Sequence, residues 1–405
     1  MKRLSLLFVL IYSFSLITNA QLFQGLDDYD PLTLFTDRSC SELKTDVTQE
    51  LINNCSAFVY KDIATKLLNN TYQKEFRIDS FIAYPNPSLD AATNKTAKYG
   101  VMDSPTGIAV MSNDTLLVFV EGIQTGFPVT LKIQTLTMTD PTIGYNSGLE
   151  ISLKNGVNKI ATGTLSATTG GLGYIRYYYQ GNTQPSNIKI NFYGGTVNGY
   201  FDSQKHTASD WSRLRNAATN TFFDLKGKYS TVTLPRQYIN TYASTRGLDL
   251  INIYDEIVRL EWKYMGLLPE PEGFGGQHRS RAYFVYMAMP EGVGANATDY
   301  RTAYPDPRIA DPAYILNESG NSRDMIWVFG HEHGHVNQTR PGFKWPGMTE
   351  VTNNLHSLCV QTEISKAFPK SKNSALNNRL QKEKHALRRR VCKSLRKSIQ
   401  SLFCS

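Results

Sequence analysis

The spacing of hydrophobic and polar positions changes along the 405-residue chain and divides it into segments. From residue 39 to residue 70, apolar positions recur every three or four residues, which predicts helices with one buried face. Residues 74–205 instead contain short apolar runs and partly alternating stretches, separated by turn sequences rich in Gly, Asn and Asp. Such a series of short strands predicts a β-sandwich or jelly roll, in which the apolar run 116–120 is a strand buried on both faces.

The pattern after residue 205 is mainly helical. Residues 248–265 have the spacing of an amphipathic helix that ends at Gly266. The long Gly- and Pro-rich passage 270–320 contains the apolar stretch 282–287, which predicts an edge strand. We therefore expect an α+β multidomain fold with an N-terminal helical segment, a β-sandwich/jelly-roll-like accessory domain and a mainly α domain. The expected bounds are 21–73, 74–205 and 206–365, followed by a tail at 366–405.

The N-terminus has the pattern of a signal peptide. Lys2 and Arg3 precede an apolar run at 4–17, and small residues then lead to an expected cleavage after Ala20. The run is too short and wrongly flanked for a membrane-spanning helix, and no other stretch approaches the required length. We expect residues 1–20 to be removed and the protein to be exported to the periplasm, the cell surface or the extracellular space.

The basic character of the chain is confined to its tail. The formal net charge is +8, and residues 366–405 hold 12 Lys or Arg and one acid, a net of +11. Residues 1–365 therefore carry 8 − 11 = −3, which argues against a nucleic-acid-binding face. We expect the tail to be poorly ordered.

The five cysteines do not form a metal knuckle, because none has the CxxC spacing. Cys40 and Cys55 could pair as a disulfide after export, although one pair is no disulfide framework. We interpret all five cysteines as structural.

The candidate chemistry gathers at residues 331–350. The HExxH sequence from His331 to His335 places both histidines on one face of a helix, and about 0.004 copies are expected by chance. Glu332 can contact a water held by the bound ion, and Glu350, fifteen residues after His335, is the natural third ligand. Two histidines and one carboxylate leave a fourth position open, as in zinc-dependent peptidases. The pattern predicts one Zn²⁺ ion. The alternative is a structural helix whose histidines form hydrogen bonds in the core.

Several neighbouring residues are candidates for supporting roles. Asn353 and Asn354 fall one turn after Glu350, where an amide could steady its carboxylate. The segment 339–347 contains two Pro and two Gly, and is the predicted turn that brings a second helix back beside the first. In the long passage before this site, the candidates for substrate contact are Tyr300, Tyr304 and Asp306, for which a scaffold role in the loop is the alternative.

Two other histidines near the motif have less specific interpretations. His333 lies two positions after His331 and should face away from the ligands, toward solvent or a supporting group. His356 lies six residues after Glu350, off the ligand face, and a structural role fits it better than a catalytic one.

The sequence resembles the M60, or enhancin-like, family of zinc metallopeptidases, which are of the gluzincin type. The resemblance rests on FGHEHGHVNQ at 329–338 and WPGMTEVTNNL at 345–355. SPTGIAV at 104–110 and LKNGVN at 153–158 resemble the accessory β domain of the family more weakly. The resemblance covers roughly residues 75–365. It implies a zincin-like domain.

The resemblance also implies residue roles and a substrate class. His331, His335 and Glu350 become zinc ligands, and Glu332 becomes the catalytic base. Members of the family act on heavily O-glycosylated proteins such as mucins, and often recognise the glycan beside the cleaved bond. We therefore expect a secreted endopeptidase with a mucin-type glycoprotein as its substrate. The oligomeric state is not indicated.

The β domain offers a second kind of contact. Four tyrosines in its sequence could stack on sugar rings, although such residues are more often half-buried in strands: Tyr174, Tyr177, Tyr178 and Tyr179. The alternative function is therefore a secreted glycan- or glycoprotein-binding protein whose metallopeptidase domain is inactive.

The tail is where the chain departs from the family pattern. The family continues through further helices after Glu363, whereas residues 366–405 are basic and show little periodicity. Two interpretations are open: a basic tail that binds an anionic surface, or a frameshift or truncation that leaves the catalytic domain incomplete. The abrupt change in composition favours the second and puts activity in question.

Overall fold

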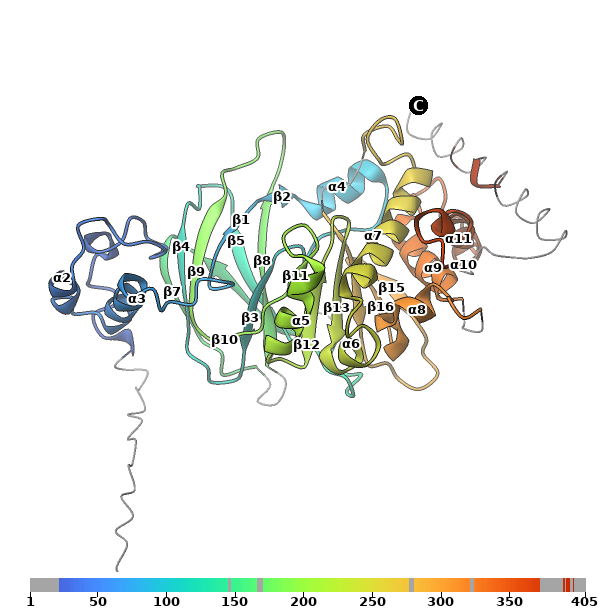
Figure 1. The fold of residues 1–405 in the computed structure, drawn as a ribbon. Coiled ribbons are helices and arrows are strands. Elements are labelled where there is room, and N and C mark those ends of the chain that lie inside the picture. The colour runs from blue at the N-terminus through green and yellow to red at the C-terminus, as the bar shows by residue number, and fades with distance from the viewer. Residues whose placement is uncertain are drawn as a thin grey trace, which may run out of the picture. The chain divides into compact units, whose positions relative to one another are not determined.

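The computed structural model describes residues 22–144, 147–165, 170–276, 280–320 and 324–371, together with 389, 391–393 and 396. The predicted signal peptide and most of the basic tail lie outside these residues. The chain divides into two compact units, one ending at Gln73 and one beginning at Lys74 (Figure 1). No helix within the described ranges is long and apolar enough to cross a membrane.

The first unit contains short helices. Its elements are η1 (Pro31–Thr33), α2 (Gln49–Asn53) and α3 (Phe58–Leu68). The helical pattern predicted from residue 39 therefore begins only at α2, where the Thr48 side chain accepts a hydrogen bond from the Leu51 amide at 3.3 Å. Cys40 and Cys55 are both buried and are not joined by a disulfide.

The strands predicted in residues 74–205 form two sheets over one core. One sheet has the order β1 (Ile78–Phe81), β9 (Ile188–Gly194), β4 (Leu116–Glu121) and β7 (Gly156–Ile160). The other has the order β10 (Thr196–Val197), β3 (Pro105–Val110), β8 (Gly171–Tyr179), β5 (Val129–Gln134) and β6 (Gly148–Leu153), with β2 (Tyr84–Pro85) paired to β8. Apolar side chains of both sheets meet in one buried cluster, which makes a sandwich. The run 116–120 is fully buried, as predicted. Between β2 and β3 lies α4 (Pro87–Asn94).

A third sheet corrects the expectation of a mainly α domain. It has six strands in the order β11 (Phe201–Asp202), β12 (Phe222–Lys226), β13 (Ser230–Pro235), β14 (Ala282–Tyr286), β16 (Arg301–Tyr304) and β15 (Asn296–Thr298). The predicted edge strand is wrong, because β14 lies between two parallel partners and all its residues are buried. A continuous apolar run suits such a central position. The edge strand is β15, which pairs antiparallel with β16.

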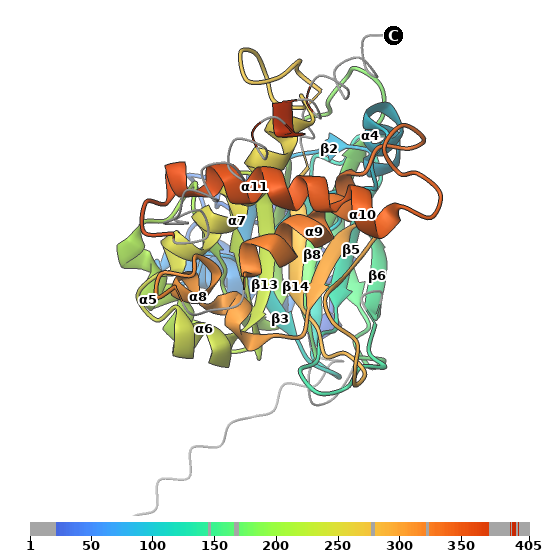
Figure 2. The ribbon, with the colours of Figure 1, turned by 90° about the vertical axis from the view of Figure 1, so that its right-hand side faces the viewer.

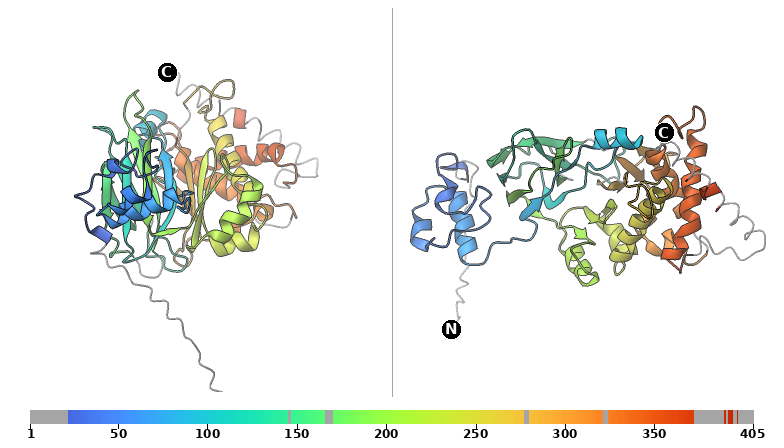
Figure 3. Two further views of the ribbon diagram at one scale, coloured as in Figure 1. Left: turned by 60° about the vertical axis from the view of Figure 1, so that its left-hand side comes forward. Right: turned by 90° about the horizontal axis from the view of Figure 1, so that it is seen from above.

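Helices accompany this sheet. They are α5 (Ala208–Ala217), α6 (Arg236–Tyr242), α7 (Gly247–Tyr264), η2 (Pro307–Ala310), α8 (Pro312–Ile315), α9 (Met325–Asn337), α10 (Thr349–Thr352) and α11 (Asn354–Ala367). Figure 2 shows α9 and α11 crossing in front of the strands β13 and β14. Figure 3 shows the yellow α7 grouped with the orange and red helices from two other directions. The predicted helix at 248–265 is confirmed as α7.

Helix α11 is tied to the tail. A disulfide joins Cys359 of α11 to Cys392, and Cys392 is 3% exposed. The tail is therefore fixed to α11 at one described residue.

Candidate metal centre

Helix α9 carries the two histidines of the motif on one face. Its N-terminus is capped by Asp324, whose side chain accepts a hydrogen bond from the Trp327 amide at 3.1 Å. Apolar residues on the opposite face, including Ile326 and Phe329, lie in the core, and this burial fixes the rotation of the helix. His331 and His335 therefore point to the same side, with ring centroids 4.9 Å apart.

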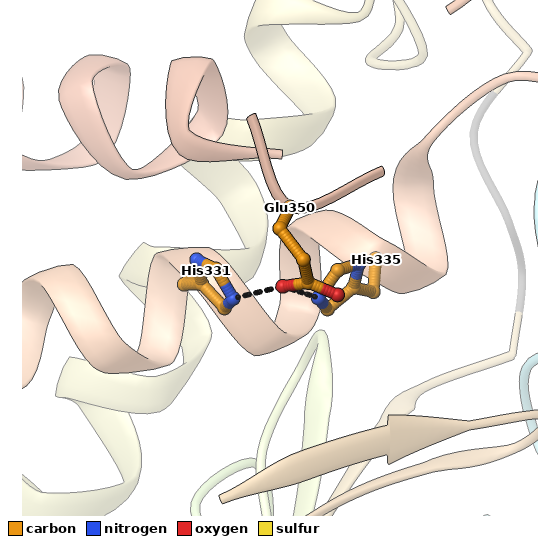
Figure 4. A group of neighbouring side chains, drawn as sticks. All are labelled: His331, His335 and Glu350. Atoms are coloured by element: carbon orange, nitrogen blue, oxygen red, sulfur yellow. Dashed lines mark hydrogen bonds and ion pairs between the residues drawn. The ribbon is translucent and has the colours of Figure 1, made fainter. Parts of the chain in front are cut away.

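Glu350 of α10 reaches both histidines (Figure 4). Its Oε2 lies 3.1 Å from Nε2 of His331 and 3.3 Å from Nε2 of His335. One ligand atom from each of the three residues lies within 4.8 Å of the others. The structure thus brings together the three residues that the sequence analysis selected as ligands.

Two glycines of α9 allow the following helix to come this close. A Cβ added at Gly330 would lie 2.9 Å from Cα of Ser357, and one at Gly334 would lie 3.0 Å from the Asn353 carbonyl oxygen. Because both positions lack a side chain, the start of α11 can lie directly against α9. This close approach carries the two asparagines at the α10–α11 junction to the histidines.

The asparagine contacts differ from the expected contact with the Glu350 carboxylate. Asn354 Oδ1 lies 2.8 Å from Nδ1 of His331, and its Nδ2 donates to the Glu350 carbonyl oxygen at 2.7 Å. Asn353 Nδ2 lies 2.9 Å from Nε2 of His335 and donates to the His331 carbonyl oxygen at 3.3 Å. Both amides therefore contact histidines of α9 rather than the carboxylate. Because Asn354 holds Nδ1 of His331, the other ring nitrogen, Nε2, faces Glu350.

Gln338 orients His335 as Asn354 orients His331, a role that the sequence analysis missed. Its Oε1 lies 3.3 Å from Nδ1 of His335. Its Nε2 donates to the Thr349 carbonyl oxygen and to Oγ1 of Thr352, both at 2.7 Å. Gln338 therefore ties the end of α9 to the helix that carries Glu350. Its position three residues after His335 was the available signal, since such pairs are neighbours on a helix.

Glu332 lies where two clefts meet. The first, which we call the β15 cleft, has a volume of about 460 Å³ and is lined by residues 295–299, both histidines and Glu350. The second, the Trp327 cleft, has a volume of about 360 Å³. Glu332 lines both and is only 7% exposed.

The protonation of the site favours metal binding and proton transfer. Burial raises the pKa of Glu332 to about 7; the Glu350 charge adds to this rise, and His331 and Arg301 oppose it. A carboxyl group with this pKa can take up and release a proton near neutral pH. Burial also lowers the pKa of His335, which favours the neutral imidazole that a metal ion requires.

The donor set fits a tetrahedral metal ion. Bonds of about 2.0–2.1 Å at tetrahedral angles separate the donor atoms by about 3.3–3.4 Å. The two distances from Glu350 Oε2 to the histidine nitrogens, 3.1 and 3.3 Å, match this spacing. Two nitrogen donors and one oxygen donor leave a fourth position for water or substrate.

The three substrate-contact candidates lie in different places. Tyr304 and Asp306 line the Trp327 cleft, but Tyr304 is only 1% exposed, and Asp306 forms an ion pair with Arg308 at 2.8 Å. Tyr300 lies at the turn between β15 and β16 with φ of 77°, and lines a small separate cavity. Lys98 Nζ lies 5.1 Å from the centre of the Tyr300 ring. Only Tyr304 and Asp306 are therefore brought to the clefts at Glu332.

The comparison with known proteins gives the family. Residues 194–400 match the family model of peptidase M60, enhancin and enhancin-like proteins. The chain belongs to this family. The M60 match includes most of the segment 366–405, where we expected the chain to depart from the family pattern. Membership of this metallopeptidase family is compatible with the metal-ligand grouping of His331, His335 and Glu350.

Solved M60 structures share the fold. A metallopeptidase from Bacteroides thetaiotaomicron matches with a TM-score of 0.70 and 29% identity, covering 83% of this chain and 55% of that one. A metallopeptidase in complex with Tn antigen matches with a TM-score of 0.60 and 28% identity, covering 74% and 53%. The structure of ZmpB from Clostridium perfringens with its M60 catalytic domain shares the fold at 18% identity, a TM-score of 0.64 and coverage of 82% and 36%. The chain spans about half the length of the first two. No curated protein matches its sequence.

The sequence analysis missed a buried polar network behind the candidate metal centre. Glu261 of α7 is fully buried and accepts a hydrogen bond from Asn337 Nδ2 at 2.7 Å. Its Oε2 also lies 3.1 Å from Nδ1 of His333 and 3.6 Å from Nδ1 of His356. Tyr99 Oη donates to Asn337 and lies 3.3 Å from Nε2 of His333. His333 is thus part of a buried hydrogen-bond network that joins α7 and α9, and His356 of α11 is buried beside it without a hydrogen bond to Glu261.

The segment before β3 forms part of the β15 cleft, and the sequence analysis did not predict this. The amide of Ala97 donates to the Val336 carbonyl oxygen at 2.8 Å, and the Arg340 amide donates to the Lys95 carbonyl oxygen at 2.9 Å. Ala97 therefore lies beside the end of α9 and lines the β15 cleft. More than two hundred residues separate these partners in sequence, so no local pattern indicates the contact.

Proposed function

We propose that this M60 chain is an exported zinc-dependent endopeptidase that hydrolyses peptide bonds in O-glycosylated, mucin-type proteins. The observation that carries the proposal is the convergence of His331, His335 and Glu350 beside the buried Glu332. Family membership supports peptidase chemistry. The neighbouring metallopeptidase that binds Tn antigen supports a glycosylated substrate.

Zinc is the ion that this donor set suits best. Two neutral imidazole nitrogens and one carboxylate oxygen with a free fourth position are the ligands of zinc peptidases. When bound, zinc supplies a Lewis acid that polarises the scissile carbonyl and lowers the pKa of water. His331, His335 and Glu350 would hold the ion.

The chain's own residues supply the proton transfer and the substrate alignment. Glu332 in its ionised form takes a proton from the attacking water and passes it to the leaving amine. The edge strand β15 lines the same cleft through residues 296–298. Edge strands expose unpaired backbone groups, so an extended substrate segment can pair with β15 and place its scissile bond near Glu332.

Cleavage by the zinc-loaded protein tests the proposal. The purified full chain should hold about one equivalent of zinc and should cut an O-glycosylated peptide faster than the same peptide without its glycan. A chelator should stop the reaction, and added zinc should restore it. Zinc-loaded protein that binds the glycopeptide without cutting it would instead support the glycoprotein-binding alternative.

Export has a separate test. We propose that residues 1–20 direct secretion and are then removed, because they have the composition of a signal peptide. N-terminal sequencing of the secreted protein should begin at Gln21. A protein that stays inside the producing cell with an intact N-terminus would contradict this part of the proposal.

Asn354→Ala is expected to weaken zinc affinity about 10–100-fold, because groups that orient a metal-bound histidine contribute this much. The change removes the acceptor for Nδ1 of His331 and the donor to the Glu350 carbonyl oxygen. Competition with a zinc-sensitive chelating dye measures the affinity. Asn354→Asp keeps the acceptor and should lose less, whereas the exposed Asn182→Ala should change nothing. An unchanged zinc affinity in folded Asn354→Ala would exclude this orienting role.

A further inference from the structure

A third cleft lies on the β-sandwich. Its volume is about 550 Å³, and we call it the sandwich cleft. Side chains of β5, β6 and β8 line it, together with the loop before β5 and residues just after β2 and β8. The residues used below are Asn86, Phe127, Glu150, Arg176, Tyr178 and Gln180. None of them lines either cleft at Glu332.

Strand alternation places the key side chains on the outer face of the sheet. Ile175, Tyr177 and Tyr179 of β8 belong to the sandwich core, so Arg176 and Tyr178 between them face outward. Of the four tyrosines considered for sugar stacking, Tyr177 and Tyr179 are therefore buried in the sandwich core. Tyr174 lies on the outer face but is buried in the core around the third sheet, so only Tyr178 is half-buried.

Two cations share one carboxylate at the sandwich cleft. Glu150 Oε1 accepts a hydrogen bond from Nη1 of Arg176 at 2.7 Å and lies 3.4 Å from Nζ of Lys132. The pairing register of β5 and β6 explains why two of these charged side chains meet, because Lys132 of β5 lies directly opposite Glu150 of β6. The Arg176 and Lys132 side chains are 15% and 1% exposed. The three side chains sum to one positive charge, which favours an anionic ligand.

Arg176 is held in place with one nitrogen available. Its Nε donates to the Val101 carbonyl oxygen at 3.3 Å, and its Nη1 bonds Glu150. Its second terminal nitrogen, Nη2, makes no hydrogen bond within the described ranges. A fixed guanidinium group with a free N–H suits a carboxylate or sulfate oxygen, since charge-assisted hydrogen bonds are the strong ones.

The other walls suit a sugar ring. Tyr178 Oη donates to the Gly100 carbonyl oxygen at 2.7 Å, which fixes this half-buried ring, and Phe127 lines the same cleft. The Asn86 side chain is fixed as well, because its Oδ1 accepts hydrogen bonds from the Ser88 and Leu89 amides. Aromatic faces beside amide groups such as Gln180 provide apolar contact and hydrogen bonds for hydroxyl groups.

We propose that the sandwich cleft binds an acidic sugar unit of a glycan, with its anionic group on Arg176 and its ring against Tyr178 and Phe127. The shared ligand chemistry is a sugar bearing a carboxylate or a sulfate. An acidic peptide fits less well, because the cleft lies on a sheet face and offers side chains rather than an open strand edge. The proposal deepens the glycoprotein substrate class proposed above and rests on it for the source of the glycan, but binding requires no peptide cleavage.

Titration of the full chain with three probes tests the proposal: 3′-sialyllactose, lactose 3′-sulfate and lactose. Calorimetry should detect binding of at least one acidic sugar, with lactose about tenfold weaker or undetectable. Binding of only one acidic sugar identifies the anionic group and supports the proposal. Equal binding of lactose, or no binding of either acidic sugar, would overturn it.

Variants locate the binding. Arg176→Gln should weaken binding of the acidic sugar about tenfold. Phe127→Ala, in a half-buried loop position, should weaken it several-fold and serves if the arginine variant does not fold. Arg213→Gln removes one positive charge from an exposed site outside the cleft and should leave affinity unchanged. Loss of binding with Lys344→Gln in the β15 cleft, but not with Arg176→Gln, would place the sugar at the metal centre and refute the proposal.

Failure of this inference can be told apart from failure of the peptidase proposal. Arg176→Gln should leave zinc content and cleavage of a peptide with a neutral O-glycan unchanged, because Arg176 lines neither cleft at Glu332. A chain that binds sialyllactose through Arg176 but cuts nothing would retain the sugar site and lose the peptidase function. A chain that cuts glycopeptides but binds no acidic sugar would show the reverse.

Discussion

Glu332→Gln is expected to lower kcat for an O-glycosylated peptide by about 10²–10⁴-fold, the usual contribution of a general base. The amide keeps the size of the carboxyl group but cannot accept the proton of the attacking water. Zinc content should stay near one equivalent, because His331, His335 and Glu350 are unchanged. Steady-state kinetics together with metal analysis of the same preparation measure both quantities.

The matched control is Glu291→Gln, which makes the same change at an exposed position. It should keep wild-type kinetics. A Glu332→Gln protein that is folded, zinc-loaded and as active as the wild type would exclude Glu332 as the base.

The pH profile follows from the same residue. Burial holds the pKa of Glu332 near 7, and the carboxyl group is protonated below that value. Only the ionised form can accept a proton, so kcat/KM should rise with pH through the pKa of Glu332. A bound cation favours the carboxylate, which moves the apparent pKa below about 7. This rise should be absent from the residual activity of Glu332→Gln.

Glu261→Ala is expected to lower the free energy of unfolding by about 3–5 kcal/mol, because it removes one partner from a buried charged network. The carboxylate accepts from Asn337 and lies 3.1 Å from His333, so both groups would lose a buried partner. Urea denaturation followed by circular dichroism, with equal zinc saturation for both proteins, measures the change.

Glu256→Ala on the same helix is the control. Its side chain accepts two hydrogen bonds from Arg259 and is half-buried, whereas Glu261 is fully buried, so its removal should lower the free energy of unfolding less. A Glu261→Ala protein that loses no more stability than Glu256→Ala would contradict the structural role of the network. Reduced zinc affinity in Glu261→Ala would show that the network also holds α9 in position for His331 and His335.

The spacing of residues along the chain determined those features of the protein that depend on local geometry. A helical repeat of 3.6 residues places His331 and His335 on one face wherever that helix lies. The amphipathic spacing at 248–265 similarly predicted α7, and the apolar run 116–120 predicted a strand buried on both faces. Glu350 was selected by its distance along the chain and its helical context, and the structure places its carboxylate between the histidines.

Tertiary structure alone decided which distant groups meet. The apolar run of β14 is compatible with a central strand, but its parallel partners β13 and β16 are determined only by the packing of the chain. The contact of Glu261 with His333, the place of Ala97 in the cleft and the charged group at Arg176 each join segments far apart in sequence. Local periodicity determines which face of an element is buried, whereas packing of the whole chain determines what that face contacts.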